Sequence, residues 1–165
     1  MIKRANKKDL QTLAEIHTNA WHINFKGIVD DDFIQYWTID RFMKKSNETQ
    51  WIDNKEIDTF VYVENDKVKG FISGNKVFGK YDYEIRLLFV DPDFQNQNIG
   101  KKLLGFQKSK IKNQGCKNMI LWTIKGLQNN IFFKNQGGEI LEEIEYEYGN
   151  KKYQGIGFVY FLKKK

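Results

Sequence analysis

The stretch around Pro92 constrains the fold of this chain more than any other feature. A run rich in aromatic and β-branched residues, 83–90, reads as a strand, and it ends just before the only proline of the chain. Proline has no backbone N–H to donate, so strand pairing stops there. A short polar segment follows, and residues 100–113 then carry apolar side chains at helical spacing. The sequence therefore predicts a strand, a tight polar loop and a helix.

Such a loop is suited to binding phosphate. The first N–H groups of a helix have no partners inside the helix, and the helix dipole adds positive charge at that end. Gly100 lets the backbone approach a ligand closely, and Lys101 adds a side-chain charge at the rim. The loop lacks the Gly-Lys-Ser/Thr ending of a P-loop and the three glycines of a dinucleotide fingerprint. A connection that binds nothing remains an equally open alternative at this point.

The rest of the chain alternates between helical and strand periodicity, with no repeat and no linker. Asn6 can cap a first helix, with Asp9 as the partner side chain. The other predicted elements are a helix at 32–45, strands at 59–64 and 67–73 around an Asn65-Asp66 turn, a strand at 118–124, a helix at 129–136 and closing strands at 139–148 and 153–162. This order predicts one α+β domain over residues 1–165.

Composition points to a cytoplasmic protein. The single cysteine, Cys116, excludes an internal disulfide, which suits a reducing compartment. No apolar signal core follows Met1, and no apolar run approaches the ~20 residues that span a bilayer, so no membrane partner is expected. His17 and His22 do not have the i, i+4 spacing of a metal pair, so no metal site is expected either.

The formal net charge of +6 leaves two interpretations open. The first interpretation is that the protein binds an anionic partner such as nucleic acid, and the second is that the lysines form a solvated surface. No nucleic-acid recognition motif accompanies the charge, so the solvated surface is favoured and no nucleic-acid partner is expected. The lysine run at 163–165 is expected to be a solvated tail.

The Pro92 loop resembles the cofactor-binding motif of the GNAT acetyltransferase superfamily. That motif runs Gln/Arg-x-x-Gly-x-Gly/Ala after a Val-x-Pro, and the matching residues here are Val90, Pro92, Gln95, Ile99, Gly100 and Leu103. Asn98 stands in place of the first glycine. Because asparagine tolerates positive φ better than most residues, the loop is expected to close.

The resemblance extends along nearly the whole chain. Residues 2–5, 9, 16–17 and 20–21 resemble the opening helix of the superfamily, and residues 25–28 resemble a Tyr-x-Gly-Ile/Leu stretch of a bacterial subgroup. Residues 84–90 resemble the central strand of that subgroup, and residues 122–138 its next strand and helix. The resemblance implies a GNAT-like α+β fold: a mostly antiparallel twisted sheet of about six or seven strands with a splayed parallel pair, flanked by about four helices.

The activity implied by the resemblance is N-acetyl transfer. An acetyl group would move from acetyl-coenzyme A (acetyl-CoA) to a primary amine of a small molecule or peptide by direct attack in a ternary complex. An amine must lose its proton before it attacks, and Glu84 is the candidate base. The alternative is a catalytically weak or inactive acetyl-CoA-binding module of the same fold. A monomer and a homodimer both remain open.

The resemblance also implies which residues form the site. The backbone of Leu88, Phe89 and Val90 would bind the pantetheine arm, and the pyrophosphate would lie on Gln95, Asn96, Gln97, Asn98, Ile99, Gly100 and Lys101. Asn129, Phe132 and Phe133 would lie near the arm or the thioester, and Trp21, Phe25, Ile28 and Glu84 would line the acceptor pocket.

One position departs from the pattern. Phe133 replaces the tyrosine that usually returns a proton to the thiolate. Water or a tyrosine of the closing strands is expected to serve instead, or the thiolate leaves unprotonated.

Overall fold

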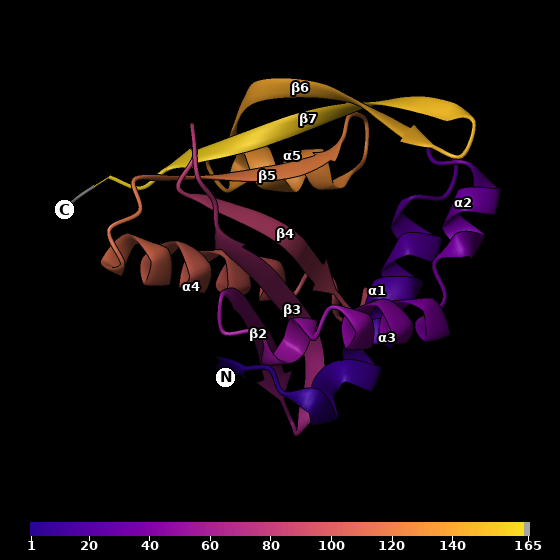
Figure 1. Cartoon of the computed structure of the whole chain (residues 1–165), viewed down its shortest axis with the longest axis horizontal. Helices are drawn as coiled ribbons and strands as arrows, with labels where there is room; N and C mark the ends of the chain where they lie inside the picture. Colours follow the sequence, from indigo (N-terminus) through magenta and orange to yellow (C-terminus); the bar gives the residue numbers. More distant parts are fainter. Residues whose placement is uncertain (164–165) are drawn as a thin grey trace.

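The computed structural model describes residues 1–163, and Lys164 and Lys165 of the terminal lysine run lie outside them. Seven strands form one mixed sheet in the order β1-β2-β3-β4-β5-β7-β6 (Figure 1). Their bounds are β1 Ile2–Arg4, β2 Ile57–Glu64, β3 Lys67–Lys76, β4 Tyr83–Val90, β5 Asn118–Ile124, β6 Glu139–Tyr148 and β7 Lys151–Phe161. All neighbours are antiparallel except β4 and β5, which confirms the mostly antiparallel sheet with one parallel pair.

Helices cover both faces of this sheet. The α-helices are α1 Leu10–Asn24, α2 Asp31–Tyr36, α3 Ile39–Glu48, α4 Ile99–Asn113 and α5 Asn129–Asn135, with short 3-10 helices η1 Lys7–Asp9, η2 Trp51–Asp53 and η3 Pro92–Phe94. Val61 and Phe71 share a core with α1 and α3, whereas Ile72, the neighbour of Phe71, packs in the core that contains α4 residues. Because successive strand residues point to opposite faces, this alternation places α1 and α3 on one face and α4 on the other.

Two expectations about the N-terminal third were wrong. Residues 2–5 do not open a helix, because Asn6 and Asp9 form a capping box that starts the helical segment only after Asn6. The residues before Asn6 are extended instead, and β1 pairs with β2. The predicted helix at 32–45 is two helices, because the backbone of Trp37 is extended and Thr38 caps α3 by accepting the Arg41 N–H at 3.2 Å.

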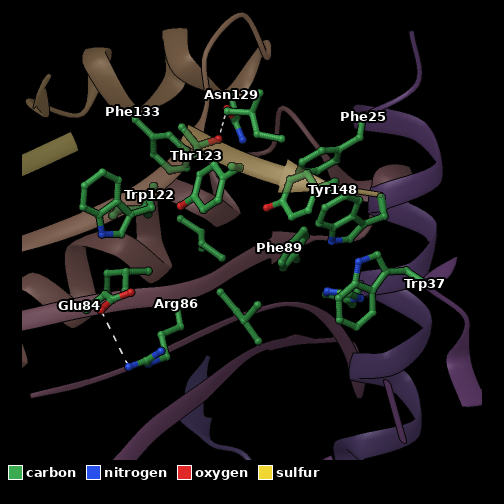
Figure 2. A pocket seen from close by; sticks show the side chains of 18 of the residues that line it. Phe25, Trp37, Glu84, Arg86, Phe89, Trp122, Thr123, Asn129, Phe133 and Tyr148 are labelled. Atoms are coloured by element: carbon green, nitrogen blue, oxygen red, sulfur yellow. Dashed lines mark hydrogen bonds and ion pairs between the residues drawn. The ribbon is translucent and has the colours of Figure 1, made fainter. Parts of the chain in front are cut away.

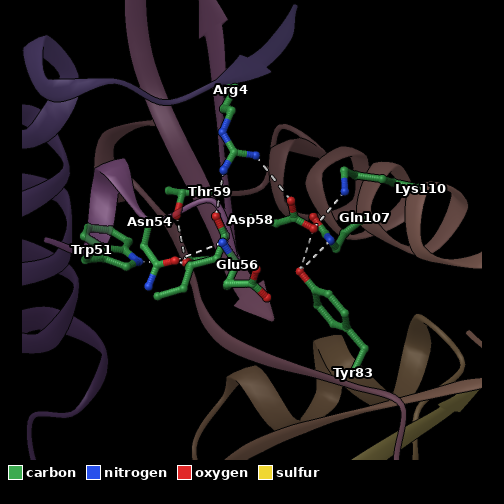
Figure 3. Close-up of polar contacts among 11 residues, drawn as sticks. Arg4, Trp51, Asn54, Glu56, Asp58, Thr59, Tyr83, Gln107 and Lys110 are labelled. Carbon is green, nitrogen blue, oxygen red and sulfur yellow. Dashed lines mark hydrogen bonds and ion pairs between the residues drawn. The ribbon is translucent and has the colours of Figure 1, made fainter. Parts of the chain in front are cut away.

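A polar network ties the beginning of β4 to β2 and α4 (Figure 3). Asp58 of β2 accepts hydrogen bonds from the Tyr83 hydroxyl at 3.2 Å and from Lys110 Nζ at 2.8 Å. The Tyr83 hydroxyl in turn accepts from Nε2 of the fully buried Gln107 at 2.8 Å. Burial, reinforced by Asp58, raises the pKa of Tyr83, so its phenol stays neutral. This end of β4 is therefore held in place.

The other end of β4 separates from β5. The two strands are paired only at Glu84 with Ile120 and at Ile85 with Leu121. A bulge follows at once on β4, because Gly74 of β3 opposes Ile85 whereas Ser73 opposes Leu87, which leaves Arg86 as the extra residue. The expected splayed pair is thus present, and the split begins at Arg86. Within residues 1–163, no helix has both the length and the apolar character needed to cross a bilayer.

Candidate active site

A cavity of about 370 Å³ lies where β4 and β5 separate (Figure 2). One wall comes from α1 and the segment after it, with His17, Trp21 and Phe25, and another comes from α5, with Asn129 and Phe133. Its remaining lining comes from β4, β5, β6, Trp37 and Lys45. Because α1 packs against the sheet from one face and Phe133 belongs to the core on the other, the cavity joins the two faces through the split.

Glu84 lies in this cavity. The position of its backbone is set by pairing with Asn75 on one side and Ile120 on the other. The side chain keeps 26% of its surface exposed, and its nearest cation is Arg86, with Nη2 at 3.9 Å from Glu84 Oε2. Arg86 also donates to the side chain of Asn75 and is half exposed. The carboxylate of Glu84 is therefore accessible from the cavity.

An aromatic wall faces Glu84 from α1. Trp21 and Phe25 stack with their ring centroids 4.0 Å apart, and both line the cavity. Trp37 lines it too. Ile28 does not join them: it is 40% exposed and lies outside the lining of the cavity. The end of α1 and the segment after it thus bring Trp21 and Phe25, two of the three apolar residues predicted to line the acceptor pocket, to the cavity and leave Ile28 at the surface.

His17 forms part of the same wall. Its ring lies between Phe42 and Phe89, at centroid distances of 4.7 and 4.9 Å, and its Nδ1 is buried with no hydrogen-bond partner among the described residues. Burial, helped by the charge of Lys45, lowers the pKa of His17 to about 3. The imidazole is therefore neutral at ordinary pH.

Two tyrosines of β6, Tyr146 and Tyr148, also line the cavity. The sequence predicted a tyrosine of the closing strands as one candidate proton donor but did not identify which one. Tyr146 and Tyr148 stack with centroids 5.6 Å apart, and neither hydroxyl has a hydrogen-bond partner within residues 1–163. The ring of Tyr146 lies over Gly155, where a Cβ would overlap it. Burial, with added repulsion from Tyr148 and Glu84, raises the pKa of Tyr146 to about 12. It remains protonated at neutral pH.

The Pro92 loop presents free backbone donors at the start of α4. Asn96 and Asn98 both have a φ of 62°, which confirms that Asn98 adopts the left-handed conformation expected of it. The Lys102 N–H bonds to the Asn98 carbonyl at 3.0 Å, and no acceptor in the described part of the chain takes the N–H groups of residues 97–101. These donors are the ones that the sequence assigned to a phosphate group.

Side chains of the loop mostly support it. Gln95 donates its amide to the Val90 carbonyl at 3.3 Å, which closes the loop on the end of β4. The side chain of Ile99 is only 2% exposed and packs in the core, so only its backbone is available to a ligand. Phe132 lies against the start of α4, since a Cβ at Gly100 would be 3.2 Å from its Cζ. Lys101 is exposed at the rim.

Apart from Ile28, the predicted site residues thus fall into two groups. Those that line the cavity are Trp21, Phe25, Glu84, Leu88, Phe89, Asn129 and Phe133. Those that belong to the loop or lie beside it are Val90, Gln95, Asn96, Gln97, Asn98, Ile99, Gly100, Lys101 and Phe132. The two groups meet at the end of β4, where Phe89 lines the cavity and Val90, the next residue, leads into the loop.

Comparisons with known proteins identify a consistent set of relatives. The profile of the acetyltransferase (GNAT) family matches residues 13–137. An uncharacterized N-acetyltransferase of Bacillus subtilis, YuaI, is 22% identical, over 94% of this chain and 90% of the relative. A spermidine N(1)-acetyltransferase of Thermoplasma acidophilum is 23% identical, over 88% and 97%. The crystal structure of PaiA N-acetyltransferase from Thermoplasma acidophilum with coenzyme A superposes with a TM-score of 0.74 and 20% identity, covering 94% of this chain and 96% of that one.

Proposed function

Because this chain belongs to the acetyltransferase (GNAT) family, we propose that it transfers the acetyl group of acetyl-CoA to a primary amine by direct attack in a ternary complex. The observation that carries the proposal is the cavity at the β4–β5 split, which is lined by Glu84 and by the rest of β4 as far as Phe89, two residues before the Pro92 loop with its free N–H groups begins. The loop offers a place for the charged end of the co-substrate, and the cavity offers a place for its reactive end.

The split also leaves part of the β4 backbone unpaired. Beyond Ile85 the strand pairs with β3 but no longer with β5, so its N–H and C=O groups on the β5 side are available. The pantetheine arm carries amide groups and can bind Leu88, Phe89 and Val90 like an added strand. It enters beside Phe132 and Gly100, with its pyrophosphate on the N–H groups of residues 97–101.

The acceptor enters from the α1 side of the cavity. Its amine nitrogen loses a proton to Glu84, directly or through one water, and attacks the thioester carbonyl. A C–N bond forms, the nitrogen gives its second surplus proton to water, the C–S bond breaks, and the bonding pair leaves with the sulfur. A positioned base of this kind contributes roughly 10²- to 10⁴-fold to the rate. A backbone N–H of Leu88 or Phe89 is the proposed donor to the carbonyl oxygen as it becomes negative.

A small-molecule amine is the acceptor that the lining supports best. Trp21, Trp37 and Tyr148 present aromatic surface, which attracts the ammonium groups of a polyamine as well as apolar carbon. Glu84 adds the one carboxylate of the lining. The relative named as a spermidine acetyltransferase makes spermidine the first acceptor to test, with an aminoglycoside and a peptide amine as further members of the panel.

Two measurements on the full chain test this proposal. Isothermal titration with acetyl-CoA should show binding, and affinity weaker than about 1 mM would defeat the proposal. Release of the coenzyme A thiol is then followed with each amine of the panel. Turnover with one of them supports an acetyltransferase, whereas tight binding with no turnover on any of them supports the non-catalytic module.

A further inference from the structure

We propose that the side-chain amide of Asn129 donates a hydrogen bond to the sulfur of coenzyme A as the C–S bond breaks, and stabilises the thiolate without giving it a proton. This inference rests on the proposed function. Asn129 would thus take part in the reaction itself, beyond lining the cavity.

Two backbone groups fix the orientation of the Asn130 side-chain amide. Its Oδ1 accepts the Gly126 N–H at 3.1 Å, and its Nδ2 donates to the Ile124 carbonyl at 3.0 Å. A backbone N–H can only donate and a carbonyl can only accept, so the amide of Asn130 cannot be turned round. Asn130 is thereby held between the end of β5 and the start of α5.

Asn130 in turn orients Asn129. The same Nδ2 of Asn130 lies 2.8 Å from a side-chain atom of Asn129, which must therefore be the acceptor, Oδ1. The Thr123 hydroxyl donates to this oxygen as well, at 3.2 Å. With its oxygen engaged twice, Asn129 has to turn its NH₂ group the other way.

That NH₂ group is free and faces the cavity. Within residues 1–163 no acceptor takes Asn129 Nδ2, and the residue lines the cavity. In Figure 2 the amide nitrogen of Asn129 points toward the middle of the cavity, while its oxygen is turned to Thr123. The structure therefore contains a donor whose direction is set before any ligand arrives, which is the arrangement that stabilises charge most effectively.

The sulfur is the atom that this donor suits. The attacking amine and Glu84 approach from one side of the thioester, so the sulfur departs on the side away from them. Asn129 and Phe133 lie four residues apart on α5 and form the opposite wall of the cavity. Phe133 has no proton or hydrogen bond to offer, which leaves Asn129 as the polar side chain that α5 presents there.

Tyr146 is less suited to this role. Burial, with added repulsion from Tyr148 and Glu84, raises the pKa of Tyr146 to about 12, so its phenol gives up a proton less readily than an ordinary tyrosine. The thiolate therefore leaves as an anion held by an amide, and it takes its proton from water after release.

The inference can be tested without an amine substrate, by measuring the pKa of the coenzyme A thiol while it is bound to the protein. The pH of the complex is raised in steps, and the ultraviolet absorbance of the thiolate is recorded at each step. The same pH titration with coenzyme A that lacks the sulfhydryl group gives the absorbance change of the protein, which is subtracted. A hydrogen bond to an anion should increase the thiolate fraction at a given pH by about tenfold or more in the wild type relative to Asn129→Ala.

Asn129→Asp sharpens the test. This variant keeps an oxygen for Asn130 and Thr123 but turns a second, negative oxygen toward the cavity. The thiol pKa should therefore rise in the order wild type, Asn129→Ala, Asn129→Asp. A purely structural role for Asn129 predicts no such order. Asn135→Ala, at an exposed position on the same helix, is the matched control and should behave as the wild type.

Steady-state kinetics with a working acceptor gives a second readout. Loss of a donor that acts on developing charge should lower kcat by about 10²-fold with little change in the KM for acetyl-CoA. A raised KM with unchanged kcat would assign Asn129 to ground-state binding of the arm and overturn the inference. Equal thiol pKa values in all variants would overturn it as well. Failure of wild-type protein to bind coenzyme A would instead defeat the proposed function.

Discussion

Ile85 of β4 and Leu121 of β5 are the last pair of residues at which the two parallel strands remain in register. Before this pair, the Tyr83–Asp58–Lys110 network holds β4 against β2 and α4. After it, the bulge at Arg86 turns β4 away, and the cavity opens between the strands. The same strand is thus rigid at one end and presents unpaired backbone at the other, which is what a preorganised binding site requires.

Replacement of Glu84 by glutamine should abolish most of the proposed activity. Glutamine keeps the shape of the side chain but cannot accept the amine proton, so kcat should fall by about 10²- to 10⁴-fold at neutral pH. Thiol release measures the effect, and affinity for acetyl-CoA should be retained. Glu143→Gln, at an exposed position of β6, is the control. Retention of full turnover by Glu84→Gln would remove Glu84 from the mechanism.

Two glycines of α4 should respond differently to alanine. A Cβ at Gly105 meets open space, so Gly105→Ala should stabilise the protein by up to about 1 kcal/mol through helix propensity. A Cβ at Gly100 would lie 3.2 Å from Phe132 Cζ and beside the free N–H groups. Gly100→Ala should therefore gain little stability and weaken coenzyme A binding about tenfold. Urea denaturation and calorimetric titration test both variants, and unchanged affinity in Gly100→Ala would contradict the assignment of the loop.

Removal of the Tyr83 hydroxyl should destabilise the fold without affecting the site. Tyr83→Phe deprives the buried Gln107 amide of its acceptor, and Gln107 Oε1 already has no partner among the described residues. The loss should be about 1–3 kcal/mol, measured by denaturation. The coupling should show in a double-mutant cycle, where Gln107→Leu costs less in the Tyr83→Phe background than in the wild type. Additive losses would mean that the hydrogen bond contributes nothing.

Acid should weaken the fold through His17. Its pKa is lowered from 6.5 to about 3, so between these values the unfolded chain binds more protons than the folded one. Stability therefore falls as the pH drops below about 6.5, by about 2 kcal/mol at pH 5 from this group alone. His17→Leu should flatten the pH dependence by this amount, as followed by urea denaturation at several pH values. An unchanged slope would show that the pKa of His17 is the same in the folded and unfolded chain.

Local features of the sequence predicted most of the secondary structure. The capping residues Asn6 and Asp9, the turn at Asn65 and Asp66, and the break at Pro92 all lie where the structure has them. Each of these acts over a few residues, so neighbouring side chains contain the necessary information. The break at Trp37 and Thr38 was missed because Thr38 lies within an otherwise helical apolar pattern, and only its capping bond shows that a new helix starts there.

Tertiary structure decided how the site is assembled. The sequence by itself determined that a strand, a left-handed asparagine and a helix follow one another around Pro92, because conformational preferences are local. It did not determine that Tyr146 would lie over Gly155, or that Asn129 would turn its NH₂ group toward the cavity. Those arrangements depend on strand register and on hydrogen bonds between separate elements, which exist only once the sheet has formed and split.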